Sequence, residues 1–235
     1  MKRVLLLFMA GAIYLLSSCE QKKIIRLFNE KNLSGWGFEL ATDSISAKQV
    51  FSVKKKNKIH ITGNPFGYMY TQKEYQNYRL HVEWRWIGDP SISGILLHAQ
   101  PLETFWRGLP FPNAIECQLK AGNAGDIVLL GNSYLDEISE ETIIKEKLHP
   151  SNEKPAGEWN HADIICRGDA ISIYINGLLQ NTAKGAIFTK GHICLQSEGG
   201  PIEFRNIRLA PLKKHQRNPN KMSGPKNRKA ERLNN

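Results

Sequence analysis

The sequence predicts an all-β domain, an antiparallel sandwich or jelly roll, and three observations support this. Many short stretches alternate apolar with polar residues, as strands of a half-buried sheet do. Glycine, proline, asparagine and aspartate, which favour turns, separate these stretches. Asn176-Gly177 follows the alternating stretch 171–175 and is typical of a tight hairpin turn, because both turn positions need positive φ. The expected strands are residues 50–53, 58–62, 78–86, 94–99, 115–120, 127–130, 161–167, 170–175, 192–196 and 202–209.

The segment 136–147 is less distinct than these strands. Its first half suits one or two helical turns, whereas Thr142-Ile143-Ile144 has poor helix propensity and favours a long loop. Both alternatives stay open.

Both ends of the 235-residue chain look like appendages to a single domain. Lys2 and Arg3 precede an apolar run at 4–16, which is typical of an export signal and too short for a permanent membrane span. The following Leu-Ser-Ser-Cys resembles the lipobox of bacterial lipoproteins, which implies a lipid anchor on Cys19. We expect a lipoprotein signal peptide at 1–18, an anchor and linker at 19–26, a β-sandwich domain at 27–212 and a disordered basic tail at 213–235. The protein would then lie in the cell envelope, facing the periplasm or the cell surface.

The net charge of +10 does not indicate a nucleic-acid partner, because most of it lies in the tail and the leader. The domain itself is nearly neutral. Beyond Cys19 there are three cysteines, Cys117, Cys166 and Cys194, each in an apolar strand-like run. Buried free thiols are therefore expected rather than a disulfide framework, and no cysteine has a spacing typical of structural zinc.

The stretch 115–120 alternates strictly, so one face of the expected strand is apolar. The other face carries an acid, an amide and a base, namely Glu116, Gln118 and Lys120. Such a face is either a polar site or a solvated surface with a Glu–Lys pair.

Three segments, taken in order, resemble the bacterial family of 3-keto-disaccharide hydrolases. This family was formerly called DUF1080 and is also described by 3-keto-glucoside lyase and hydratase activity. The segments are Leu-Phe-Asn-Glu-Lys-Asn-Leu-Ser-Gly-Trp at 27–36, Gly-Glu-Trp-Asn at 157–160 and Leu-Gln-Ser-Glu-Gly-Gly-Pro-Ile-Glu-Phe-Arg-Asn-Ile at 195–207. Two positions depart from the family pattern: Glu30 replaces a glycine, and Ile92 replaces an asparagine often found beside the sugar.

This resemblance implies a concanavalin A-like jelly-roll sandwich of two antiparallel sheets, with a sugar held on a concave sheet. It also implies cleavage of 3-keto-glycosides that a partner sugar 3-dehydrogenase has oxidised. A C3 ketone acidifies the C2 hydrogen, so cleavage can proceed by deprotonation, elimination and hydration. A general base, an acid and a stabiliser of the C3 oxygen are needed, and a divalent metal ion is one possible stabiliser.

For this chemistry Glu116 is the expected base, with Glu198 as second carboxylate and His98 as acid or metal ligand. Other polar or aromatic residues are expected to bind substrate: Gln118, Lys120, Glu83, Arg85, Gln196 and Trp106. For each of these residues a purely structural role is the alternative.

Two other functions fit the same residues. The domain could be a non-catalytic glycan-binding module, since a fold alone does not settle activity. It could also be an ordinary two-carboxylate glycoside hydrolase that uses Glu116 and Glu198.

Overall fold

The computed structural model describes residues 24–55, 57–101, 108–138 and 142–213. The expected signal peptide, the expected anchor Cys19, the tail beyond residue 213 and the candidate Trp106 all lie outside these residues. Within the described ranges no helix is long and apolar enough to cross a membrane.

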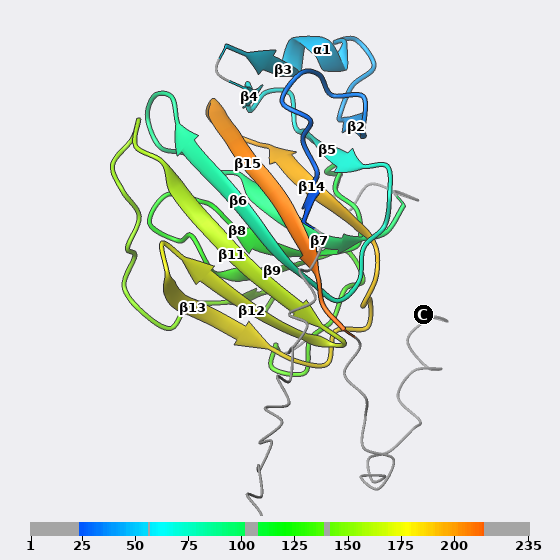
Figure 1. Ribbon diagram of the computed structural model, residues 1–235, viewed down its shortest axis with the longest axis vertical. Coiled ribbons are helices and arrows are strands. Elements are labelled where there is room, and N and C mark those ends of the chain that lie inside the picture. Colours follow the sequence, from blue (N-terminus) through cyan, green and yellow to red (C-terminus); the bar gives the residue numbers. More distant parts are fainter. Residues whose placement is uncertain (1–23, 56, 102–107, 139–141, 214–235) are drawn as a thin grey trace, which may run out of the picture.

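Two antiparallel sheets pack face to face, and Figure 1 shows the eight-stranded sheet in front of the seven-stranded one. The eight-stranded sheet has the order β13-β12-β11-β6-β15-β4-β3, with β1 also paired to β15. Its strands are β1 (Ile25–Arg26), β3 (Phe51–Lys54), β4 (Lys58–Ile61), β6 (Tyr78–Trp86), β11 (Asn160–Arg167), β12 (Ala170–Ile175), β13 (Leu178–Ala183) and β15 (Ile202–Pro211).

The seven-stranded sheet has the order β10-β9-β8-β7-β14-β5-β2. Its strands are β2 (Trp36–Leu40), β5 (Gly67–Thr71), β7 (Gly94–Ala99), β8 (Ala114–Gln118), β9 (Ile127–Leu130), β10 (Ile144–Lys145) and β14 (His192–Ser197). One short helix, α1 (Ala47–Val50), precedes β3. The expected all-β sandwich of two antiparallel sheets is confirmed.

The described part of the segment 136–147 contains loop and the short strand β10, and no helix. The β-branched residues before Lys145 suit this edge strand, which pairs with β9.

The main core lies between the sheets, and alternation along the strands builds it. In β6 the residues at every second position are buried, from Tyr78 to Trp86, while those between them reach the outer surface. The cysteines Cys117, Cys166 and Cys194 are buried and free, as the sequence predicts.

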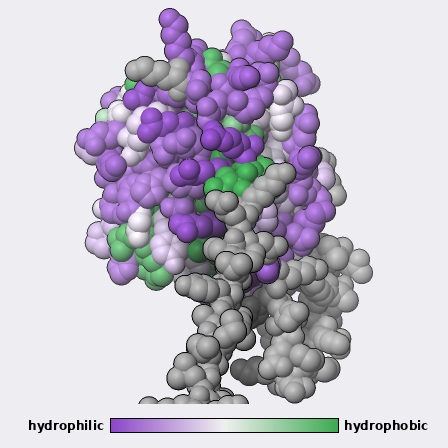
Figure 2. All heavy atoms as spheres, viewed as in Figure 1, coloured by the Kyte–Doolittle hydropathy of each residue, from purple (hydrophilic) through white to green (hydrophobic). Residues whose placement is uncertain are grey.

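The outer faces of the two sheets differ in character. The outer face of the eight-stranded sheet is largely hydrophilic (Figure 2). The outer face of the seven-stranded sheet instead carries a second apolar cluster, which explains why β7 and β9 are buried on both faces. We call it the outer cluster; it contains Tyr68, Leu96, Ala99, Phe111, Ala114, Val128, Leu130 and Cys194. A polar side chain on this face therefore lies in an apolar environment.

Candidate functional site

Glu116 lies at the centre of the outer face of the seven-stranded sheet. Strand β8 runs between β7 and β9, and its register places Glu116 opposite Leu96 on one side and Val128 on the other. Both neighbours belong to the outer cluster. As a result Glu116 is only 2% exposed, which excludes the solvated surface that the sequence left as an alternative.

Gly94 provides the space that the Glu116 carboxyl group fills. A Cβ atom at position 94 would lie 2.1 Å from Glu116 Oε1 and 2.7 Å from its carboxyl carbon. The carboxyl group therefore lies over the backbone of β7 at the one position where no side chain intervenes. The absence of a side chain at Gly94 thus determines where the carboxyl group lies.

The environment of Glu116 favours its neutral form. Burial, followed by the charge of Glu198, raises the pKa of Glu116 to about 8. Its Oε1 atom is buried and has no hydrogen-bond partner among the described residues. Buried polar atoms are normally satisfied, so this oxygen lacks the hydrogen-bond partner that a buried carboxyl group usually has.

Glu198 and Gln196 extend the site along β14. Strand β14 pairs with β7, and the register that joins Leu195 to Ile95 brings Gln196 beside Gly94. Gln196 is buried, and its Oε1 atom also lacks a partner among the residues described. Glu198 follows the strand, is partly buried, and has its pKa raised by burial. The structure thus brings Glu116, Gln196 and Glu198 together.

The Ile92 departure lies at the edge of this group. A Cβ atom on Gly199, the residue after Glu198, would lie 2.8 Å from Ile92 Cγ2. Next to it, Ser93 Oγ donates a hydrogen bond of 2.9 Å to the carbonyl oxygen of Gln196. The segment before β7 is thereby tied to β14, and an apolar side chain replaces an amide at this border.

Gln118 and Lys120 behave differently from the sequence expectation, because β8 ends at Gln118. Gln118 Oε1 accepts hydrogen bonds from the backbone N–H groups of Leu119 and Lys120, at 3.0 and 2.9 Å. Its Nε2 group remains as a donor at the end of the strand. Lys120 is exposed in the turn that follows, outside the strand.

His98 does not join the site, since the alternation of β7 breaks at this residue. His98 has a φ of 51°, and the pairing of β7 with β14 shifts register beside it. Its ring packs edge-on against Tyr78 of the opposite sheet, with 5.7 Å between ring centroids. Burial lowers the pKa of His98 to about 4. His98 is thus a neutral interior side chain.

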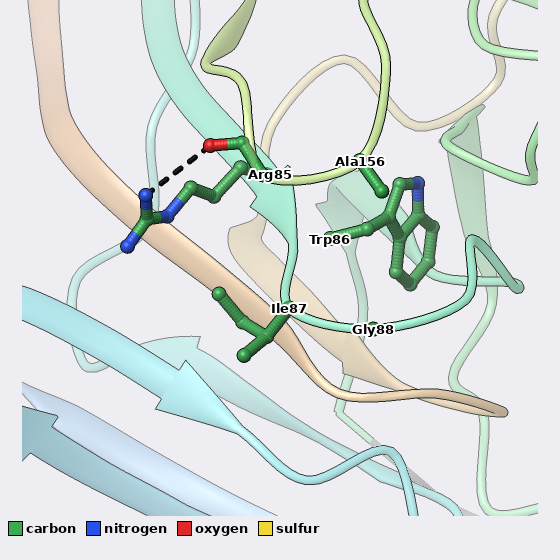
Figure 3. A pocket seen from close by; sticks show the side chains of 6 residues that line it. Arg85, Trp86, Ile87, Gly88 and Ala156 are labelled. Atoms are coloured by element: carbon green, nitrogen blue, oxygen red, sulfur yellow. Dashed lines mark hydrogen bonds between the residues drawn. The ribbon is translucent and has the colours of Figure 1, made fainter.

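Glu83 and Arg85 also lie away from Glu116, because β6 belongs to the eight-stranded sheet and these two side chains are on its outer face. Figure 3 shows Arg85 and Trp86 pointing in opposite directions from the end of β6, beside a hollow lined by Ile87, Gly88 and Gly157. Arg85 Nη1 donates to the carbonyl oxygen of Gly157, at 3.2 Å.

Both residues are engaged in ion pairs that connect strands. Arg85 and Lys58 both bind the carboxylate of Glu203, each at 2.8 Å. Glu83 accepts from Arg205 at 2.6 Å, and the Arg205 guanidinium lies 3.9 Å from the ring centroid of Trp159. These contacts account for Glu83 and Arg85 as structural residues, so substrate binding is not needed to explain their presence.

Sequence reasoning did not select Gly94 or Tyr68, which lie beside Glu116 and Gln196. Tyr68 of β5 pairs with Gln196, and Phe66 precedes that strand. The signal for β5 was present in Gly-Tyr-Met-Tyr-Thr, an aromatic-rich alternating run. Gly94 stands in the same short stretch as the Ile92 departure, but only the cross-strand register shows what its missing side chain makes room for.

The described residues contain no group of three or more His, Cys, Asp or Glu side chains placed to hold a metal ion. The polar groups that the site brings together are carboxyl groups and amides. At neutral pH Glu116 holds a proton that it can donate, and Glu198 is a second, less buried carboxyl group beside it. Two neighbouring carboxyl groups are a common arrangement for acid–base catalysis.

Several solved structures similar to this chain are named as hydrolases, glucanases or carbohydrate-binding modules. A candidate glycosyl hydrolase from Parabacteroides distasonis has a TM-score of 0.59 at 21% identity, covering 80% of this chain and 94% of that one. A β-glucanase from Bacillus licheniformis has a TM-score of 0.54 at 14% identity, with coverages of 82% and 98%. The carbohydrate-binding module CBM66 from Bacillus subtilis has a TM-score of 0.55 at 9% identity, with coverages of 75% and 95%. These likenesses confirm the jelly-roll fold.

A search of curated protein sequences finds no match. The profile of one family, described as the 3-keto-alpha-glucoside-1,2-lyase-like domain, matches residues 23–210. This match spans both sheets and every residue of the site built above. The chain therefore belongs to the 3-keto-alpha-glucoside-1,2-lyase-like domain family.

Proposed function

We propose that this protein cleaves 3-keto-glycosides by elimination followed by hydration. Membership of a glycoside hydrolase-like, carbohydrate-active family supports the general class of activity. The observation that carries the finer proposal is the Glu116 carboxyl group. It is buried, its Oε1 has no partner among the described residues, it fills the space that Gly94 leaves open, and the charge of Glu198 acts on it.

The first step of the proposed reaction is removal of the C2 proton by the Glu198 carboxylate. The C–H electron pair becomes an enolate on the C3 oxygen, which an amide N–H group can stabilise by donating a hydrogen bond. Gln118 Nε2 is suited to this because its own Oε1 is already held by the backbone.

In the second step the C3 carbonyl re-forms, a C1=C2 double bond forms and the bond from C1 to the leaving oxygen breaks. Glu116 donates its proton to that oxygen. Water then adds across the double bond, with hydroxide at C1 and a proton at C2, so that the net reaction is hydrolysis. The pKa of about 8 favours Glu116 as the acid, so the proposal exchanges the roles that the sequence suggested for the two carboxyl groups.

Two further proposals depend on resemblances in the sequence, the first on the family and the second on the lipobox-like Leu-Ser-Ser-Cys that ends at Cys19. The substrate would be supplied by a sugar 3-dehydrogenase, because a C3 ketone requires prior oxidation. The site of action would be the cell envelope, with the protein held by a lipid on Cys19.

The experiment compares p-nitrophenyl and methyl glucosides, each in plain and 3-keto form, with protein lacking residues 1–19. We expect turnover of the keto substrates alone. Glu198→Gln should slow both keto substrates by about a hundredfold or more, in the usual range for loss of a general base. Glu116→Gln should slow the methyl glycoside far more than the p-nitrophenyl one, whose leaving group needs no proton.

Glu158→Gln, at an exposed position in the loop before β11 of the other sheet, is the matched control and should retain full activity. Turnover of the plain glucosides would instead indicate ordinary two-carboxylate hydrolysis. Binding without turnover of any substrate would indicate a glycan-binding module. A parallel series with a chelator tests whether a divalent ion contributes at the C3 oxygen.

A further inference from the structure

Phe66 is an exposed aromatic residue beside the carboxyl pair, and nothing described so far uses it. Among the described residues it is the one aromatic side chain in the set of exposed large hydrophobics, at 36% exposure. A single exposed hydrophobic residue needs no explanation by itself. The position and fixation of Phe66 distinguish it from the aliphatic members of that set.

Phe66 and Glu198 directly follow the last pair of the register between β5 and β14. Strands β14 and β5 pair Gln196 with Tyr68 and Ser197 with Gly67, so the next pair in line is Glu198 with Phe66. By alternation Phe66 and Tyr68 face the same side as Gln196 and Glu198. The Phe66 ring indeed contacts Phe111 of the outer cluster, with 6.5 Å between centroids and 26° between the ring planes.

The ring is held in place before any ligand binds. The backbone carbonyl of Phe66 accepts a hydrogen bond of 2.8 Å from Ala41 N–H. Ser197 Oγ donates to the carbonyl oxygen of the preceding Pro65 at 2.9 Å. Phe111, which supports one side of the ring, is 2% exposed. An aromatic ring fixed in this way can bind a ligand with little further loss of conformational entropy.

We propose that Phe66 is a platform for the sugar ring, contacting its apolar C–H face while Glu198 and Gln196 face its polar groups. Sugar sites combine such an apolar surface with a few convergent polar atoms, and the unpartnered Oε1 atoms of Gln196 and Glu116 supply acceptors for hydroxyl groups. That the bound sugar is a 3-keto-glycoside rests on the proposed function. That Phe66 binds a pyranose ring does not.

The contact is made equally in the ground state and the transition state, so its loss should affect binding rather than chemistry. We expect Phe66→Ala to raise KM by about tenfold, in line with the loss of one aromatic contact, with kcat changed less than twofold. Phe66→Trp should restore the KM. Ile87→Ala, which removes an exposed aliphatic side chain just after β6 of the other sheet, is the matched control and should change neither constant.

Direct binding separates this inference from the proposed function. Calorimetry with the Glu116→Gln protein and with its Phe66→Ala double variant uses plain and 3-keto methyl glucosides as probes. Thermal unfolding of each variant verifies that it is folded. About tenfold weaker binding in the double variant supports the platform even if no substrate is turned over. Equal binding by the Glu116→Gln protein and the double variant would overturn the platform proposal. So would the absence of binding of either sugar to the Glu116→Gln protein.

Discussion

At the scale of single residues, the site depends on a carboxyl group placed where it cannot readily ionise. Glu116 is surrounded by Leu96, Val128 and the backbone of Gly94. Moving its pKa from 4.5 to about 8 corresponds to about 5 kcal/mol of preference for the neutral form. The fold therefore bears a cost at neutral pH to keep an acid in this position.

Glu116→Gln should raise the free energy of unfolding, because an amide has no charge to bury. The folded protein retains the proton up to about pH 8, whereas the unfolded chain loses it near pH 4.5. The stability of the parent protein therefore falls as pH rises through this window, and the stability of the variant does not. Denaturant unfolding should show nearly equal stability at pH 4 and an advantage of about 3 kcal/mol for the variant at pH 7. An advantage that does not depend on pH would show that Glu116 ionises freely in the folded state.

Gly94→Ala should displace the Glu116 carboxyl group, since the new methyl group would lie within 2.1 Å of Oε1. We expect kcat for a methyl 3-keto-glucoside to fall by about tenfold to a hundredfold, in the range typical of a misplaced catalytic group. Gly88→Ala, where a Cβ atom meets nothing within 4 Å, is the control. Full activity in the Gly94→Ala protein would show that Glu116 does not need the space beside Gly94 for its function.

At the scale of strands, alternation and turn chemistry were sufficient to locate much of the sheet framework. The predicted bounds of β6, β7, β9 and β12 agree with the structure. Alternation also identified Glu116 and Gln196 as polar residues on one face. It could not tell which sheet a strand joins, so Glu83 and Arg85 were expected at the site although they belong to the opposite sheet.

The two other differences have local causes. His98 turns into the interior because a positive φ and a register shift interrupt the period of two. Lys120 falls outside the site because the Gln118 side chain binds the backbone of Leu119 and Lys120, where the strand ends. Neither the register shift at His98 nor the strand end at Gln118 leaves a pattern in the sequence, since both depend on contacts made in the folded sheet.

The ion-pair group around Glu203 holds three strands of the eight-stranded sheet together, through Lys58 of β4, Arg85 of β6 and Glu203 of β15. Although burial opposes it, the hydrogen bonds from Lys58 and Arg85 keep the pKa of Glu203 below its usual value. Its contribution to stability is thus present at neutral pH and lost as pH falls through the lowered pKa.

Glu203→Gln should therefore destabilise the protein by about 3 kcal/mol at pH 7, because two partly buried cations lose their counter-charge. The deficit should shrink in acid, and sugar binding should be unchanged, since the group lies on the sheet opposite the site. Urea unfolding at pH 7 and pH 4 measures the difference, with Glu158→Gln as the exposed control. Equal destabilisation by Glu203→Gln and Glu158→Gln would show that the ion pairs of Glu203 contribute no more to stability than an exposed charge does.

At the scale of the whole molecule, the two sheets have divided tasks. The eight-stranded sheet presents a hydrophilic outer face of paired charges (Figure 2). The seven-stranded sheet is apolar on both faces and uses the outer cluster to isolate a few polar groups from water. Low local polarity strengthens every hydrogen bond and charge interaction made with a bound sugar. This division explains how a sandwich shared by hydrolases and binding modules can support acid–base chemistry at one place.

The central claim is that a glycosidic bond breaks through loss and return of the C2 proton, and the origin of that proton tests it most directly. A methyl 3-keto-glucoside would be cleaved in D₂O, and the 3-keto-glucose released would be analysed at once for deuterium at C2. Product incubated with the Glu198→Gln protein for the same time would correct for spontaneous exchange. Elimination and hydration predict one deuterium at C2 in essentially every product molecule. Release of product that keeps its original C2 hydrogen would contradict the account.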